Sequence, residues 1–398
     1  MTGASMPVRA IVRWLLPACA ALGMLGFAQA QPRVPASDEV IVETLPFVAG
    51  WAREERRLRR ELAQRPRDES VAIAAAQAYL ELARSQGDAR YAGRAMGALQ
   101  AWEPVSAEST PASVLVMHAT VAQFLHDFDG AEATLKMALA REPSNAQAWI
   151  TLATILRVRG RYAESDTACR SLARVGPALY GVACLAENAG LRGDHVAART
   201  ALQGLLADAA LQGPRNAGTR QWLLTSVAEI EELAGRPAAA DAAYRQALDA
   251  ERSGYLLLAY SDFLQRRGRA VEVAALLAKE PRSDAVLLRL AAAHRSGPGQ
   301  PTSPEARELQ ARFEAAAVRP GTAAVHAREE ALFALDVQDD PQQALALARL
   351  NVQLQREPID LLVFARAAVA AHDEAARREV KALLQRIGLK DARIDAIL

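Results

Sequence analysis

One pattern limits the fold of this chain more than any other, a self-similarity at a fixed spacing of 34 residues. The segments 112–143 and 146–177 align without a gap. The alignment matches residues of similar kind along both segments: Ala119 with Ala153, Phe128 with Tyr162, Leu135 with Cys169 and Pro143 with Pro177. A fixed period of this length predicts a row of similar supersecondary units.

Further copies extend the pattern in both directions. A third copy, in the segment 223–252, has matching residues at the same offsets: Ala228, Gly235, Ala240, Tyr244 and Ala247. A looser unit around Gly87 precedes the three copies, and another with Gly268 and Pro281 follows them. Apolar residues recur at helical spacing and Gly or Pro separates the helical stretches, so each unit is predicted to be a pair of antiparallel helices.

These units resemble the tetratricopeptide repeat family. The segment 146–177 has the residues that the family expects at several positions: Trp149, Leu152, Ala153, Gly160, Tyr162 and Pro177. It departs from the family at Ser165 and Leu172, where Ala is usual and where the preceding copy has Ala131 and Ala138. The resemblance implies an all-α, right-handed superhelical solenoid of about nine helix pairs. Composition agrees, because 51% of residues are hydrophobic but only 5% are aromatic, with Ala and Leu supplying most of the apolar content.

The pattern divides the chain into five segments: a signal peptide (1–30), a linker (31–43), an N-terminal capping helix (44–64), the repeat array (65–281), and degenerate repeat-like pairs with a C-terminal cap (282–398). The charged run 53–62, REERRLRREL, places Glu55 and Arg59 at helical spacing. It therefore predicts a solvated helix face rather than a patch for nucleic acid or a membrane. The segment 297–304, GPGQPTSP, is either a longer loop or a hinge between two sub-arrays.

The first thirty residues have the features of an export signal. Arg9 and Arg13 precede an apolar run, and Ala28-Gln29-Ala30 ends it, which predicts cleavage between Ala30 and Gln31. The protein is then expected in the periplasm or secreted, with no membrane insertion after cleavage. An alternative is a lipoprotein anchored through Cys19, which follows the sequence LPA.

The chain has no recognisable motif for catalysis or cofactor binding, so no catalytic residue and no cofactor is predicted. The nearest to a metal cluster is the segment HDFDG, with His126, Asp127 and Asp129. We interpret it as an inter-helix turn in which Asp129 caps the next helix, and predict no metal site. An enzyme or small-ligand site between helices is kept as an alternative.

In the tetratricopeptide family the first helix of each pair lines the concave surface. The resemblance therefore implies a partner-binding groove at the corresponding positions: Thr120, Gln123, Phe124, Gln147, Ile150, Thr154, Arg157, Val158, Trp222, Glu229 and Glu232. The Lys and Asn clamp of the best-known peptide-binding subfamily is absent, since Ile150, Thr154 and Val158 stand in its place. The mixed character of these positions suits a helix or an extended segment of another protein.

Cys169 and Cys184 would be the cysteines left after signal cleavage. They lie at similar distances on either side of the turn at Gly176-Pro177, which would place them level on adjacent antiparallel helices. A disulfide between two repeats is one interpretation, and a pair of small core residues is the other.

A formal net charge of +1 indicates no strong attraction to nucleic acid. We therefore expect a non-enzymatic protein–protein interaction scaffold in the cell envelope that supports assembly of a complex. The sequence specifies neither the partner, nor the pathway, nor the oligomeric state.

Overall fold

The computed structural model describes residues 48–295, 303–317 and 326–398. These residues form twenty α-helices and no β-strand, and they belong to one compact unit, Glu43–Leu398. The expected signal peptide, its cleavage site at Ala30 and Gln31, Cys19, the linker 31–43 and residues 297–302 of the expected loop or hinge lie outside the described residues.

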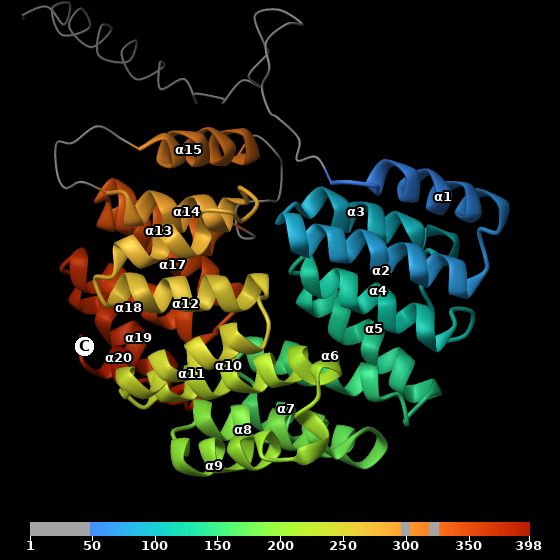
Figure 1. The fold of residues 1–398 in the computed structure, drawn as a ribbon, viewed down its shortest axis with the longest axis horizontal. Coiled ribbons are helices and arrows are strands. Elements are labelled where there is room, and N and C mark those ends of the chain that lie inside the picture. Colours follow the sequence, from blue (N-terminus) through green and yellow to red (C-terminus); the bar gives the residue numbers. More distant parts are fainter. Residues whose placement is uncertain (1–47, 296–302, 318–325) are drawn as a thin grey trace, which may run out of the picture. The chain divides into compact units, whose positions relative to one another are not determined.

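The first helix, α1 (Trp51–Gln64), is followed in the described chain by nine consecutive helix pairs and a short last helix, α20 (Ala392–Asp395). The pairs are α2 (Glu69–Gln86) with α3 (Ala89–Ala98), α4 (Ala112–Phe124) with α5 (Phe128–Arg141), α6 (Ala146–Val158) with α7 (Tyr162–Val175), α8 (Ala178–Leu191) with α9 (His195–Leu206), α10 (Ala217–Leu233) with α11 (Pro237–Ala250), α12 (Gly254–Arg266) with α13 (Ala270–Leu277), α14 (Asp284–Ala293) with α15 (Pro304–Ala317), α16 (Ala327–Phe333) with α17 (Pro341–Leu354), and α18 (Pro358–Ala370) with α19 (Glu374–Ile387). The two helices of each pair are in contact, and successive pairs stack on one another (Figure 1). The prediction of an all-α solenoid of about nine pairs is confirmed.

The turn inside eight of these pairs contains one residue in the left-handed backbone region. These residues are Gly87, His126, Gly160, Gly193, Gly235, Gly268, Asp339 and His372. Glycine adopts this conformation at little cost, whereas His and Asp do so less readily. The turn geometry is therefore more regular than the sequence, because the units around His126, Asp339 and His372 keep the left-handed turn although they lack the Gly of the others.

Small and large residues have different roles in the packing of the helices, as the repeat pattern implies. Ala119, Ala153 and Ala228 are fully buried in the first helices of their pairs, where the missing bulk lets helices approach closely. Leu135 and Tyr244, at one equivalent position in the second helices, fill the space between pairs and are also fully buried.

Helix α1 covers the start of the array. Its Trp51 ring packs edge-on against Tyr79, at 5.4 Å between ring centroids, and against Tyr91 at 6.1 Å. Arg57 pairs with Glu54 and Glu61 on its own helix. Glu55 pairs with Arg94 of α3, and not with Arg59 as the sequence spacing suggested.

The C-terminal helices return to the middle of the array. The backbone N–H of Arg356 donates to the carbonyl of Val158 at 2.7 Å, and that of Lys390 donates to the carbonyl of Leu191 at 2.9 Å. A Cβ added at Gly160 would lie 3.1 Å from Ile387, and one at Gly193 would lie 2.9 Å from Lys390. Residues about two hundred positions apart in sequence therefore meet at the turns of α6–α7 and α8–α9.

This contact is also hydrophobic. Three residues of the middle repeats, Tyr162, Leu191 and Leu233, belong to the same buried cluster as residues of α14–α20 such as Phe364 and Leu389. Repeat units in a solenoid ordinarily contact only their neighbours. Here the last pairs also cover the inter-helix turns of pairs far earlier in the chain.

Candidate partner-binding groove

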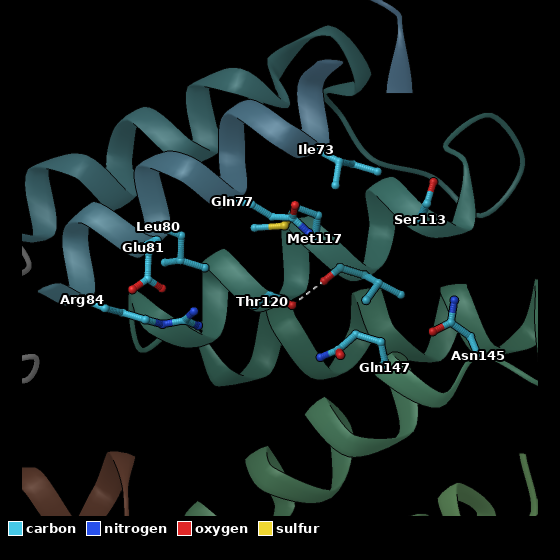
Figure 2. Close-up of a pocket in the computed structure, with 11 residues that line it drawn as sticks. Ile73, Gln77, Leu80, Glu81, Arg84, Ser113, Met117, Thr120, Asn145 and Gln147 are labelled. Carbon is cyan, nitrogen blue, oxygen red and sulfur yellow. Dashed lines mark hydrogen bonds between the residues drawn. The ribbon is translucent and has the colours of Figure 1, made fainter. Parts of the chain in front are cut away.

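An open groove runs across the first helices of the first three pairs. It has a volume of about 560 Å³ and is lined by residues of α2 and α4 and by the start of α6: Ile73, Gln77, Leu80, Glu81, Arg84, Ser113, Val116, Met117, Thr120, Asn145 and Gln147. Figure 2 shows their side chains pointing into a common space from the three helices. Stacking of the first helices of successive pairs produces this surface.

The groove combines an apolar floor with polar walls. Leu80, Val116 and Met117 are buried and form the apolar part. Glu81 and Arg84 lie together at one end, and Asn145 and Gln147 lie toward the other (Figure 2). Such a surface can pack against an apolar side chain and bind the polar groups of an extended segment or a helix at the same time.

Several polar groups of the groove are already bonded within the protein. The Thr120 hydroxyl donates to the carbonyl of Val116 at 2.8 Å. Asn145 is the N-cap of α6 and accepts from the N–H of Ala148 at 2.9 Å. By contrast, the amide of Gln77 has no hydrogen-bond partner among the described residues, and its side chain is exposed. Gln77 is thus a free polar group in the middle of the α2 wall.

Two of the residues predicted from the sequence, Thr120 and Gln147, line this groove. Phe124 instead packs against the core of the first two pairs, and Gln123 is not among the lining residues. Ile150 and Thr154 are half-buried on α6, where the Thr154 hydroxyl donates to the Ile150 carbonyl at 2.9 Å.

Sequence reasoning missed the α2 wall, although a signal for it exists. If the left-handed turn residues Gly87 and His126 are aligned, an offset of 39 residues places Gln77, Glu81 and Arg84 at the positions of Val116, Thr120 and Gln123. The first unit is separated from the second by five more residues than the regular period, so alignment at 34 residues could not find it.

The predicted positions on later helices are engaged inside the protein. Arg157 forms an ion pair with Glu187 of α8, and the carbonyl of Val158 accepts the N–H of Arg356. Trp222 is half-buried against the core of the middle pairs, and its ring lies 6.0 Å from that of Tyr180.

Glu232 is the most heavily bonded of the predicted residues. Its buried carboxylate accepts from Tyr244 at 2.7 Å, from Arg266 at 2.5 Å and from Arg393 at 3.1 Å. Burial by itself would raise the pKa of Glu232, but Arg266 and Arg393 hold it below its usual value. Since Arg393 lies in α20, this carboxylate connects the fifth pair to the C-terminal end of the described chain.

Glu229 has a different environment one turn earlier on α10. Its carboxylate accepts from the hydroxyl of Tyr255, whose side chain is 63% exposed. Burial, together with the nearby carboxylates of Glu187, Glu232 and Glu357, raises the pKa of Glu229 to about 7. Among the described residues, Glu229 has no cationic partner of the kind that stabilises Glu232.

The segment HDFDG forms the turn before α5 and the start of that helix. His126 is the left-handed turn residue, and burial lowers the pKa of its imidazole. Asp127, not Asp129, is the N-cap of α5 and accepts from the N–H of Gly130 at 3.0 Å. Asp129 pairs with Arg159 of the next repeat. The described residues contain no group of three or more His, Cys, Asp or Glu side chains placed to hold a metal ion.

A disulfide joins Cys169 of α7 to Cys184 of α8, with 5.7 Å between their Cα atoms. The two helices are especially close here, because a Cβ added at Gly181 would lie 2.4 Å from the Cβ of Ala173. Asn188 bonds the Ser165 hydroxyl at 2.9 Å beside the bridge. The disulfide therefore connects the second helix of the third pair to the first helix of the fourth.

Reduction of this disulfide is expected to lower the free energy of unfolding by about 2–3 kcal/mol, because the bridge closes a loop of about fifteen residues in the unfolded chain. Urea unfolding of the oxidised and the reduced protein measures the difference. The Cys184→Ser variant is the control, since the reductant should leave its stability unchanged. Detection of both thiols as free in the denatured, unreduced protein would contradict the bridge.

No described helix has both the length and the apolar content needed to cross a lipid bilayer.

No protein-family model and no curated protein matches the chain.

Solved structures of repeat proteins show a distant likeness. Pseudomonas aeruginosa PilF is 13% identical, with 69% of this chain and 91% of that chain covered and a TM-score of 0.32. A tetratricopeptide repeat protein from Parabacteroides merdae is 15% identical, with coverage of 72% and 97% and a TM-score of 0.31. Human IFIT1 is 13% identical, with coverage of 80% and 73% and a TM-score of 0.42. Sequence identities and TM-scores this low do not indicate a binding partner. The basis for a proposed function is therefore the chain's own helix pairs and groove.

Proposed function

We propose that this protein is a non-enzymatic scaffold that binds a segment of another protein in the groove formed by α2, α4 and α6. The observation that carries the proposal is the groove itself, with its buried apolar floor and its unbonded Gln77 amide. An amphipathic segment could bury apolar side chains on Leu80 and Met117 while its polar groups meet Gln77 and Gln147. Support for assembly of an envelope complex is part of the same proposal.

We place the partner at this groove because several other predicted groove positions are bonded within the protein. Arg157, Val158 and Glu232 are bonded to other parts of the chain, including the C-terminal segments around Arg356 and Arg393. These positions are therefore assigned to the internal structure, and the partner is assigned to the N-terminal three pairs. Trp222 and Glu229 remain candidate contacts for a longer partner segment that continues along the array.

We further propose that the scaffold works outside the cytoplasm, in the periplasm or as a secreted protein. The disulfide between Cys169 and Cys184 supports this, because disulfides persist in oxidising compartments. The export signal predicted for residues 1–30 agrees with it. Mass spectrometry of the N-terminus of the exported protein distinguishes cleavage before Gln31 from an acylated Cys19.

The Gln77→Arg substitution is expected to weaken binding of a co-purified partner at least about tenfold, which corresponds to about 1.4 kcal/mol. A bulky cation in the middle of the groove would block access to the apolar floor, and its charge would lose hydration beneath the bound segment. Because Gln77 is exposed and unbonded, thermal unfolding of the variant should match that of the unsubstituted protein.

The matched control is Ala133→Arg, at an exposed position of α5 that does not line the groove. Partner retention should be measured by quantitative pull-down from the envelope fraction for both variants. Equal retention by Gln77→Arg and Ala133→Arg would contradict a role for this groove. Recovery of no stoichiometric partner by the unsubstituted protein would contradict the scaffold function itself.

A further inference from the structure

A second cavity lies where the C-terminal helices meet the middle repeats. It has a volume of about 230 Å³, and its lining residues come from three places: Gly160, Arg161, Tyr162, Ala163 and Glu164 at the turn into α7, Arg192 after α8, and Arg386 and Ile387 at the end of α19. Three of its eight lining residues are arginines and one is a carboxylate. It is separate from the groove of α2, α4 and α6, since no residue lines both.

The arginines of this cavity differ in how far they are neutralised. Arg161 donates to Glu132 and Glu164, each at 2.6 Å, and Arg192 pairs with Asp166 at 2.8 Å. Arg386 is exposed and pairs with no carboxylate of the described chain. A guanidinium has five N–H donors, so Arg192 and Arg386 retain donors for a further acceptor.

A second unpaired guanidinium lies next to this group. Arg356 donates to the carbonyls of Val352 at 2.9 Å and Arg159 at 3.0 Å, and it has no carboxylate partner among the described residues. Burial lowers the pKa of Arg356, and the positive charges of Arg386 and Arg159 lower it further. Arg386 and Arg356 are thus the two arginines of this junction that have no carboxylate partner among the described residues.

From this cavity, its unpaired Arg386 and the remaining donors of Arg192, we infer that the junction binds a small tetrahedral oxyanion of the phosphate or sulfate class, held by Arg386 and Arg192. Guanidinium groups bind such oxyanions through paired, charge-assisted hydrogen bonds. The bound ion would bridge α19 to the repeats that contain α7 and α8. It would also offset the repulsion between Arg386 and Arg356, so ligand binding is coupled to the contact between the two parts of the chain.

Titration with inorganic phosphate tests this inference on the full chain, by calorimetry and by thermal unfolding at constant ionic strength set with sodium chloride. We expect saturable binding and a rise in unfolding temperature for the unsubstituted protein. Arg386→Gln should weaken phosphate binding about tenfold, because one charge-assisted pair of hydrogen bonds is lost. Arg378→Gln is the matched control, since Arg378 lies on the same helix outside the cavity, is exposed, and has no carboxylate partner in the described part of the chain.

A response to chloride equal to the response to phosphate would overturn the inference, and so would equal phosphate binding by Arg386→Gln and Arg378→Gln. Amide hydrogen exchange locates the site independently, because phosphate should slow exchange at Lys390, whose N–H bonds to Leu191. Unchanged exchange at Lys390 under saturating phosphate would also count against it. Parallel titration with O-phosphoserine identifies the source: binding as tight as that of phosphate assigns an esterified phosphate, and binding of the free ions alone assigns inorganic phosphate or sulfate.

Discussion

Replacing Arg328 by Met is expected to lower the free energy of unfolding by about 4 kcal/mol. Asp360 is fully buried and accepts two hydrogen bonds from Arg328, at 2.6 and 3.0 Å. Glu357 accepts a third at 2.5 Å. Removal of the guanidinium would leave a buried carboxylate without its cation, and chemical denaturation measures the cost.

The double variant Arg328→Met/Asp360→Asn separates this cause from lost packing. Without the carboxylate there is no uncompensated charge, so the double variant should be more stable than Arg328→Met alone. A double variant whose loss equals the sum of the two single losses would contradict the assignment.

The loss in Arg328→Met should also depend on pH. Burial raises the pKa of Asp360 in the native protein, and Arg328 acts in the opposite direction. In the variant the native-state pKa therefore rises further above the unfolded value, and protonation of Asp360 stabilises the folded state. The deficit should be largest above that pKa and should shrink as the pH falls through it. Equal deficits at pH 5 and pH 8 would contradict this explanation.

Replacing Tyr244 by Ala is expected to cost about 4 kcal/mol. Tyr244 is the largest fully buried side chain of the described residues, and its ring stacks on that of Tyr260 with 5.1 Å between centroids. Truncation would leave a cavity between α10 and α12 and remove one of the donors to the buried carboxylate of Glu232. Urea unfolding of Tyr244→Ala and Tyr244→Phe separates the loss of the ring from the loss of the hydroxyl. Removal of the hydroxyl alone is expected to cost about 1–2 kcal/mol.

Tyr255→Ala is the matched control for Tyr244→Ala. Both tyrosines donate a hydroxyl to a glutamate of α10, but Tyr255 is 63% exposed. Its removal should change the free energy of unfolding by less than about 1 kcal/mol. A comparable loss in both variants would show that burial does not determine the cost at these positions.

The sequence was sufficient to predict the helix pairs, because the period of 34 residues reports a local unit whose residues are all close in the chain. The pairing of Cys169 with Cys184 was accessible for the same reason, since the two residues lie in consecutive helices. The predicted N-cap of α5 was wrong by two residues, because the helix begins at Phe128, so Asp127 precedes it and Asp129 lies in its first turn.

The candidate groove was only partly predictable. Equivalent positions in a repeat face the same side of the array, and two of the positions predicted in this way, Thr120 and Gln147, line the groove. The same rule could not distinguish Glu232, because its partner Arg393 comes from a segment 161 residues away that has no repeat signature. Periodicity describes contacts between neighbours, and it contains no information about the return of the last helices to the middle of the array.

That return has a consequence for how the protein reaches its native state. In an ordinary repeat array each unit can become ordered as soon as its neighbour exists, so folding can proceed vectorially from one end. Here the turns of α6–α7 and α8–α9 lack their cover until Arg356 and Lys390 have been added. The middle repeats therefore complete their folding only after the last helices are present, and unfolding should be cooperative across the whole described unit rather than a fraying of single repeats.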